Sequence, residues 1–220
     1  LLRAASQYGL DGIDVDLEYL PAWLRESYTT LIRELSERLK PAGLGLSISI
    51  PAKVWDDRTS PWGGAFDYEA LAPYADEIAI MAYDEHAPGL QAGPVASLGW
   101  VERVVEYAAS KIEPSKILLG IPAYGYDWVA GTTIVRGLSA TGAIARAAER
   151  GAEILWDSGA QVPYYIYWEG ATRRIVYFEN GDSARPKLDL VTKYGLKGIA
   201  IWRLGLEEPG LWAAVRDKLG

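Results

Sequence analysis

The sequence predicts an α/β fold, because short apolar runs with strand character alternate with segments of helical periodicity. Five such runs cover residues 12–18, 44–50, 77–83, 116–121 and 198–202. Alternation of strand and helix is typical of a parallel sheet joined by right-handed crossovers. The first four runs begin 32, 33 and 39 residues apart. Each interval is about the length of one strand–helix unit.

Helical periodicity is clearest between the first two runs. Six apolar residues there fall on one stripe, and Pro41 and Gly43 end it. The stripe consists of Leu24, Tyr28, Leu31, Ile32, Leu35 and Leu39. Similar spacing predicts helices around 100–108 and 211–215, and residues 1–8 have the pattern of the end of a helix.

The 82-residue interval between the starts of the fourth and fifth runs predicts an insertion, because it does not divide into two further strand–helix units. Its expected elements are a helix at 141–150, a strand at 153–156, and a hairpin of 164–168 with 174–178 that turns at Glu169-Gly170. The interval therefore predicts a small α+β substructure on the loop after the fourth strand.

A barrel is favoured over an open doubly wound sheet. Small and apolar residues alternate along 44–50, and an insertion on a strand–helix loop is typical of the (β/α)8 TIM barrel. With about five parallel strands we expect this barrel to be incomplete, and with Leu1 at its start we expect a fragment or a processed product. The expected parts are barrel residues 1–126, an α+β insertion at 127–182, and barrel residues 183–220.

Composition disfavours several classes of function. The net charge of −7 argues against nucleic acid or an anionic membrane surface as the main partner. No apolar run approaches the roughly 20 residues of a membrane helix. The chain has no cysteine and one histidine, His86, which disfavours thiolate or histidine-rich metal sites and a Ser–His–Asp triad. Nine Trp and fourteen Tyr against two Phe favour a groove that stacks on a polar ligand.

The first strand carries the main candidate for chemistry. Because strand side chains alternate, Asp14, Asp16 and Glu18 share one face, with successive Cα atoms roughly 6.5–7 Å apart. Like charges at this separation resist simultaneous ionisation, so we expect at least one of their pKa values to be raised.

Three interpretations of this acidic row remain open. It could be a solvated or Arg-paired strand, which we disfavour because both faces are expected to be buried. It could be a Mg²⁺ or Ca²⁺ site, although no second acidic strand supplies further ligands. The favoured interpretation is acid catalysis, in which Glu18 at the carboxyl end of the strand donates a proton and Asp16 assists it.

Residues 11–18, Asp-Gly-Ile-Asp-Val-Asp-Leu-Glu, fit the signature D-G-x-D-x-D-x-E, and the chain resembles glycoside hydrolase family 18, which acts on N-acetylglucosamine-containing glycans. Three further segments resemble the family in order: Met81–Asp84, Gly120–Gly125 and Ile201–Trp202. The resemblance covers the family's strands four to eight and lacks strands one to three. Segments 83–86, 156–164 and 201–205 most resemble the bacterial spore-cortex and cell-wall N-acetylglucosaminidases.

The resemblance implies a retaining, substrate-assisted mechanism without metal or cofactor, an exception to the usual carboxylate pair. It implies that Glu18, Asp16, Asp14 and Tyr83 are catalytic. It also implies that Asp84, Trp202, Tyr124, Glu85 and His86 bind substrate, and that Asp11 and Met81 support the site. From its place at the turn, Asp11 is expected to fix the entry into the strand by hydrogen bonds.

The implied partner is an N-acetylglucosamine-containing polysaccharide, with spore-cortex peptidoglycan favoured over chitin, and with neither nucleic acid nor membrane insertion. The resemblance favours an extracellular, cell-wall or spore-associated location, and the oligomeric state stays open. Trp55, Trp62 and Trp128 are expected either to line outer subsites or to pack in the core. An inert or carbohydrate-binding fragment, or a divalent-metal carboxylate site, are the alternatives.

Overall fold

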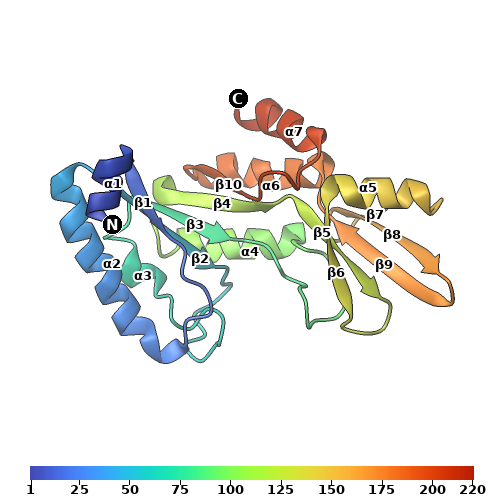
Figure 1. Cartoon of the computed structure of the whole chain (residues 1–220), viewed down its shortest axis with the longest axis horizontal. Coiled ribbons are helices and arrows are strands. Elements are labelled where there is room, and N and C mark those ends of the chain that lie inside the picture. The colour runs from blue at the N-terminus through green and yellow to red at the C-terminus, as the bar shows by residue number, and fades with distance from the viewer. The chain divides into compact units, whose positions relative to one another are not determined.

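The computed structural model describes residues 1–220 and contains two five-stranded sheets (Figure 1). The first is parallel, in the order β1 (Gly12–Val15), β2 (Gly45–Pro51), β3 (Glu77–Met81), β4 (Ile117–Pro122) and β10 (Gly198–Trp202). The predicted α/β fold with about five parallel strands is confirmed, and β1 and β10 are the two edges of a sheet that does not close into a barrel.

The residues group into two compact units. The first comprises Leu1–Met81, Val104–Leu119 and Tyr194–Gly198. The second comprises Ala82–Arg103, Gly120–Lys193 and Ile199–Gly220. None of the helices combines the length and the apolar character needed to cross a membrane.

In the first unit, β1, β2 and β3 pair in parallel register, with Asp14 opposite Ser47 and Ile48 opposite Ile78. Along β2, Leu46, Ile48 and Ile50 are buried, while Ser47 and Ser49 alternate with them on the other face. The alternation predicted for 44–50 is therefore confirmed, and it turns a row of small polar side chains toward the face that carries Asp14.

The helices of this unit are α1 (Leu2–Tyr8), α2 (Arg25–Leu39) and the short α3 (Tyr68–Leu71), with one-turn 3-10 helices at Ala22–Leu24, Lys40–Ala42 and Pro114–Lys116. Figure 1 shows α2 as the long helix beside β1 and β2. The expected stripe on α2 is correct except at Leu31, which is 39% exposed. Ser36 takes the buried position instead, and its Oγ donates to the Tyr74 carbonyl at 2.8 Å.

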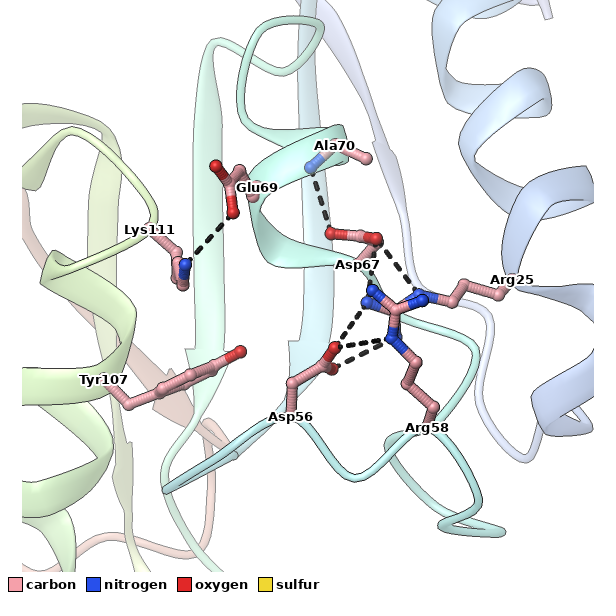
Figure 2. Close-up of a pocket in the computed structure, with 8 residues that line it drawn as sticks. All are labelled: Arg25, Asp56, Arg58, Asp67, Glu69, Ala70, Tyr107 and Lys111. Atoms are coloured by element: carbon pink, nitrogen blue, oxygen red, sulfur yellow. Dashed lines mark hydrogen bonds and ion pairs between the residues drawn. The ribbon is translucent and has the colours of Figure 1, made fainter.

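Charged side chains tie the start of α2 to the loop after β2 (Figure 2). Arg25 Nη2 lies 2.8 Å from a carboxylate oxygen of both Asp56 and Asp67. Asp67 also caps α3, because its Oδ1 accepts from the Ala70 N–H at 3.1 Å. Burial raises the pKa of Asp56, but hydrogen bonds from Lys53 and Arg25 outweigh it and lower that pKa to about 2. Both carboxylates are therefore neutralised by local cations.

The second unit contains the antiparallel sheet, in the order β6 (Val135–Ser139), β5 (Tyr124–Val129), β9 (Thr172–Phe178), β8 (Val162–Glu169) and β7 (Leu155–Asp157). The helix α5 (Ala140–Glu149) packs on one face of this sheet, as Figure 1 shows. The core between them is formed by Ala143, Ala147, Tyr165, Tyr167, Val176 and Phe178.

The remaining helices are α4 (Leu98–Ala109), α6 (Gly181–Tyr194) and α7 (Pro209–Leu219). The structure confirms the hairpin predicted after residue 164, with Glu169 opposite Thr172, and the helices predicted near 100, 141 and 211. Three elements, β5, β6 and α6, were not predicted from the sequence. Pro186 inside α6 obscured the helical pattern, although Asn180 and Ser183 form a reciprocal cap at its start.

The first strand of the parallel sheet ends earlier than expected. The first strand was expected to run to Glu18, but β1 ends at Val15, opposite Ile48. Leu17 is 42% exposed and does not join the buried face. The pairing of β1 with β2 ends at Val15–Ile48, and the backbone turns away a few residues later, where Tyr19 has φ 56°.

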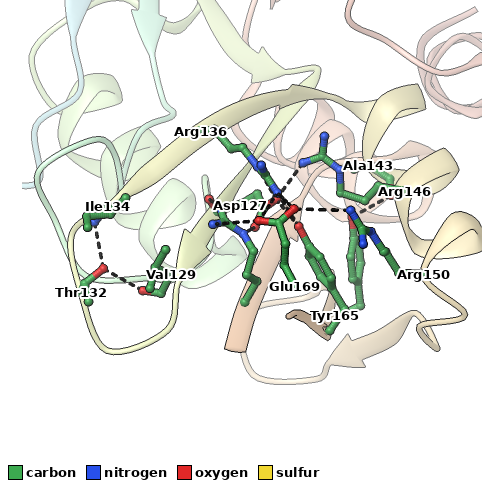
Figure 3. Close-up of polar contacts among 12 residues, drawn as sticks. Asp127, Val129, Thr132, Ile134, Arg136, Ala143, Arg146, Arg150, Tyr165 and Glu169 are labelled. Atoms are coloured by element: carbon green, nitrogen blue, oxygen red, sulfur yellow. Dashed lines mark hydrogen bonds and ion pairs between the residues drawn. The ribbon is translucent and has the colours of Figure 1, made fainter. Parts of the chain in front are cut away.

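One buried carboxylate links the elements of the second sheet (Figure 3). Asp127 of β5 is fully buried and accepts hydrogen bonds from Arg136 Nε at 2.9 Å, Arg146 Nη1 at 2.7 Å, Tyr167 Oη at 2.7 Å and Arg174 Nε at 2.7 Å. The donors come from β6, α5, β8 and β9. Burial raises the pKa of Asp127, but the hydrogen bonds from Arg174, Tyr167 and Arg136 outweigh it and lower that pKa. The carboxylate is therefore a charged junction of four elements.

Replacing Asp127 by Asn is expected to lower the free energy of unfolding by about 3–5 kcal/mol, because it removes the buried and nearer of the two carboxylates that pair with buried Arg174. Urea unfolding at pH 7 measures the loss. A carboxyl whose folded pKa is lowered stabilises the fold above its unfolded pKa and loses that effect as pH falls through the folded pKa. The difference between wild type and Asp127→Asn should therefore shrink in acid.

The control is Glu169→Gln, at a half-buried position that pairs with Arg136 at 3.1 Å, and its loss of stability should be much smaller. Equal losses for the two variants would show that Asp127 is not the junction described.

Candidate active site

The acidic row begins with Asp14, which is held by hydroxyl groups of the neighbouring strand. Its Oδ1 accepts from Ser47 Oγ at 2.5 Å and its Oδ2 from Ser49 Oγ at 3.4 Å. Burial, followed by the negative charge of Asp14, raises the pKa of Asp16. The expected raised pKa therefore falls on Asp16, and the partners of Asp14 are hydroxyls rather than the arginines of the first interpretation.

Asp14, Asp16 and Glu18 are all exposed, so the expectation that both faces of this strand are buried is wrong. The face of β1 opposite the acids is covered: Val15 and, on α2, Tyr28 are buried. Burial and then the charges of Asp14 and Asp16 raise the pKa of Tyr28, which places this phenol within electrostatic range of the acids. The acidic row therefore faces solvent, while the opposite side of β1 packs against buried side chains.

The backbone turns sharply after Glu18. Tyr19 has φ 56°, in the left-handed region that a non-glycine residue rarely occupies. Its ring packs edge-on against Trp62, with ring centroids 5.0 Å apart. Trp62 is therefore partnered, whereas Trp55 is 62% exposed. Trp128 is fully buried, so it belongs to the core and does not line an outer subsite.

A second set of predicted residues gathers in the second unit, after β3. Asp84 is exposed and has φ 63°, again left-handed. Its Oδ1 accepts from Tyr124 Oη at 2.5 Å and from Tyr126 Oη at 3.0 Å. Burial and the charge of Asp84 raise the pKa of Tyr124, which keeps its hydroxyl protonated as a donor. The Tyr83 ring lies edge-on to Tyr124, with centroids 6.3 Å apart.

Asp84, Tyr124 and Tyr126 border a cavity of about 260 Å³. Its lining consists of Asp84, Tyr124, Tyr126, Gly137, Leu138, Ser139, Trp202 and Leu206. Trp202 is 44% exposed, and its carbonyl accepts from the Ala123 N–H at 2.8 Å. Three predicted substrate-binding residues, Asp84, Tyr124 and Trp202, therefore share one cavity.

Sequence analysis missed Tyr126, because it did not predict β5. The signal was present: aromatic residues alternate at Tyr124, Tyr126 and Trp128, which is the period of a strand.

Glu85 and His86 hold their own loop. Glu85 Oε2 accepts from the Ser97 N–H at 2.8 Å, and His86 Nδ1 lies 3.0 Å from the Pro94 carbonyl. Their role as substrate contacts stays a prediction.

Of the two supporting residues, Met81 is buried. The hydrogen bond at the turn into β1 comes from the Asp11 carbonyl, which accepts from the Gly45 N–H at 2.9 Å. This backbone bond aligns the starts of β1 and β2.

A larger cavity of about 360 Å³ lies in the first unit, around the charged cluster of Figure 2. It contains none of the predicted site residues. Its cations face carboxylates: Arg25 binds Asp56 and Asp67, and Lys111 Nζ lies 3.0 Å from Glu69. We assign no chemistry to this internally neutralised surface. No three His, Asp or Glu side chains of the structure are grouped so as to hold a metal ion.

Comparison with known proteins gives a family match over most of the chain. Residues 1–207 match the family described as Glycosyl hydrolases family 18. Among curated proteins, the cortical fragment-lytic enzyme of Bacillus subtilis is 33% identical over 223 residues, which is 99% of this chain and 52% of that protein. The putative sporulation-specific glycosylase YdhD of Bacillus subtilis is 34% identical over 213 residues, which is 94% of this chain and 50% of that protein. The chain thus spans about half the length of these relatives.

Solved structures share the fold along the whole chain. A chitinase from Chromobacterium violaceum ATCC 12472 matches with a TM-score of 0.94 and 35% sequence identity. The match covers 100% of this chain and 69% of the chitinase chain. The spore cortex-lytic enzyme SleL from Bacillus megaterium QM B1551 has a TM-score of 0.89 and 31% identity, covering 100% of this chain and 51% of its own.

The electrostatic coupling within the acidic row gives a prediction. Replacing Asp14 by Asn removes the charge that raises the pKa of Asp16, so that pKa should fall toward its ordinary value. Carboxyl-carbon NMR titration of Asp16 measures the change. Asp11→Asn, a control at the start of the same strand, should leave the pKa of Asp16 where it is. An unchanged value in Asp14→Asn would refute the coupling.

Proposed function

Because the chain belongs to glycosyl hydrolase family 18, we propose that it hydrolyses β-1,4-linked N-acetylglucosamine glycans, with spore-cortex peptidoglycan favoured over chitin. The observation that carries the proposal is the acidic row, in which Asp14 is anchored by two serines, Asp16 has a raised pKa, and Glu18 follows at the carboxyl end. The relatives named for cortex lysis and sporulation favour peptidoglycan, while the chitinase of known structure keeps chitin as the alternative.

In the proposed first step, Glu18 protonates the glycosidic oxygen of the leaving sugar. The acetamide oxygen of the substrate forms a bond to C1 as the bond from C1 to the leaving oxygen breaks, which gives an oxazolinium ion. In the second step, water attacks C1, Glu18 accepts its proton, and the bond from C1 to the acetamide oxygen breaks. Two displacements at C1 give net retention of configuration.

Asp16 and Asp14 offset the charge that develops on the substrate during these two steps. Asp16 accepts from the acetamide N–H and stabilises the positive charge that develops on the acetamide. In this proposal Asp14 shares a proton with Asp16, whose pKa is raised by burial and by the charge of Asp14. Ser47 fixes the inner end of this pair through Asp14.

Tyr83, Asp84 and Trp202 are assigned to binding and orienting the sugar. Tyr83 donates its hydroxyl hydrogen to the acetamide carbonyl and aligns it for attack. Tyr124 and Tyr126 both bind Oδ1 of Asp84, which leaves Oδ2 to accept from a sugar hydroxyl. The half-exposed ring of Trp202 supplies an apolar surface for the sugar face.

A second candidate function is binding of the same glycans without cleavage. The exposure of Asp14, Asp16 and Glu18 favours it, because an efficient general acid works in a site that excludes water. The two candidates differ in one measurement, the release of new reducing ends.

Replacing Glu18 by Gln is expected to lower kcat at least ~100-fold while the fold is kept, because the proton donor is lost. Mass spectrometry of the products from cortex peptidoglycan and from soluble chito-oligosaccharides measures the effect and identifies the glycan. Glu26→Gln, an exposed position in the first turn of α2, is the matched control. Unchanged turnover in a folded Glu18→Gln protein would exclude the proposed acid.

Excess chelator is expected to leave kcat unchanged, because every charge in the proposed mechanism is handled by the substrate and by protein side chains. The assay is product release before and after dialysis against EDTA, with Mg²⁺ and Ca²⁺ added back in separate samples. Loss on dialysis and recovery with one cation would instead support the divalent-metal interpretation of the acidic row.

A further inference from the structure

Gly137 of β6 lines the cavity that contains Asp84 and Trp202, and neither backbone conformation nor crowding requires a glycine there. A Cβ built on Gly137 meets nothing within 4 Å, and its φ lies outside the left-handed region. Gly125 differs, because a Cβ there would lie 2.3 Å from the Phe178 Cβ. Gly131 differs too, with φ 78°. A glycine inside a strand weakens the strand, and it often marks a place where a ligand approaches the backbone.

The register of β5 and β6 fixes where a side chain at position 137 would point. Gly137 lies directly opposite Tyr126 in the antiparallel pair. Residues so paired project from the same face, with Cβ atoms about 4.5–5.5 Å apart. Tyr126 lines the cavity and donates to Asp84 at 3.0 Å. A side chain at 137 would therefore enter the cavity beside the Tyr126 ring, in space that is empty.

We propose that Gly137 is a specificity-determining residue, whose missing side chain makes room for a bulky substituent on O3 of the bound amino sugar. The inference rests on the proposed function. In peptidoglycan, alternate sugars carry a lactyl ether on O3, whereas in chitin every O3 is a hydroxyl. The empty volume at position 137 thus admits the substituted sugar, and chitin does not need it.

The carboxylate in the cavity lining indicates which charge the O3 substituent should carry. Asp84 is the one ionisable carboxylate in the cavity lining, beside two tyrosines. A free lactyl carboxylate would meet this like charge, whereas a lactyl group in amide linkage is neutral and offers an N–H donor. The expected ligand is therefore a glycan whose lactyl groups are amide-linked, as they are when a peptide is attached.

The test compares Gly137→Leu with Gly99→Leu, using two glycans of equal length. One is a chito-oligosaccharide, and the other alternates N-acetylglucosamine with peptide-bearing N-acetylmuramic acid. Gly99 is an exposed position of α4, where a Cβ would meet only Arg103 Nη1, at 3.8 Å. For Gly137→Leu, kcat/KM on the substituted glycan should fall at least ~10-fold, and on the chito-oligosaccharide change less than ~2-fold. Gly99→Leu should change kcat/KM on neither glycan. For Gly137→Ala, kcat/KM on the substituted glycan should lie between the values of the wild type and Gly137→Leu.

Binding to each glycan, measured by calorimetry, separates this inference from the hydrolase proposal. If the wild type cleaves neither glycan, the hydrolase proposal fails, and the inference stands only if Gly137→Leu loses affinity for the substituted glycan alone. Equal losses on both glycans, no loss on either, or a wild type that does not bind the substituted glycan would each overturn it. Thermal melts confirm that the compared variants are folded.

Discussion

The parallel pairing of β1 with β2 fixes the direction of the acidic side chains on which the proposed chemistry depends. Each step along a strand reverses the side chain, so placing Val15 in the buried layer places Asp14, the first acid of the row, on the opposite face. The same register brings Ser47 opposite Asp14 as a hydrogen-bond donor. A slip of one residue would bury the carboxylates and expose the apolar residues, which makes the register costly to change.

The sequence specified most strongly those features that follow from local periodicity. The alternation along β2 and the apolar stripe of α2 are repeats of two and of three to four residues, and both appear in the structure. The hairpin β8–β9 followed from a short turn between two apolar runs. Within the candidate site, the cluster of Asp84, Tyr124 and Trp202 was predicted by motif resemblance, and the raised pKa of Asp16 by the spacing of the acids.

The missed features depend on partners far away in the sequence. Asp127 gains its place from Arg174, 47 residues later, and Tyr126 points at Asp84, 42 residues earlier. No local sequence pattern predicts either of these long-range contacts. The exposure of the acids was also unpredictable, because it depends on β1 lying at the edge of its sheet, and edge or centre is a property of the whole strand order. Local sequence patterns therefore identified the candidate acids better than they predicted the burial and the long-range contacts of the site.

The arginine junction at Asp127 has a consequence for how the second sheet forms. Two of the four donors that replace water at its carboxylate, Tyr167 and Arg174, lie 40 and 47 residues away. Contacts of such separation require the intervening chain to close first, which makes them slow relative to hairpins and helices. The hairpin β8–β9 has only local contacts between its strands. When β5 joins it, the Asp127 carboxylate exchanges water for guanidinium donors. Complete formation of this sheet therefore includes the transfer of the Asp127 carboxylate from water to protein donors.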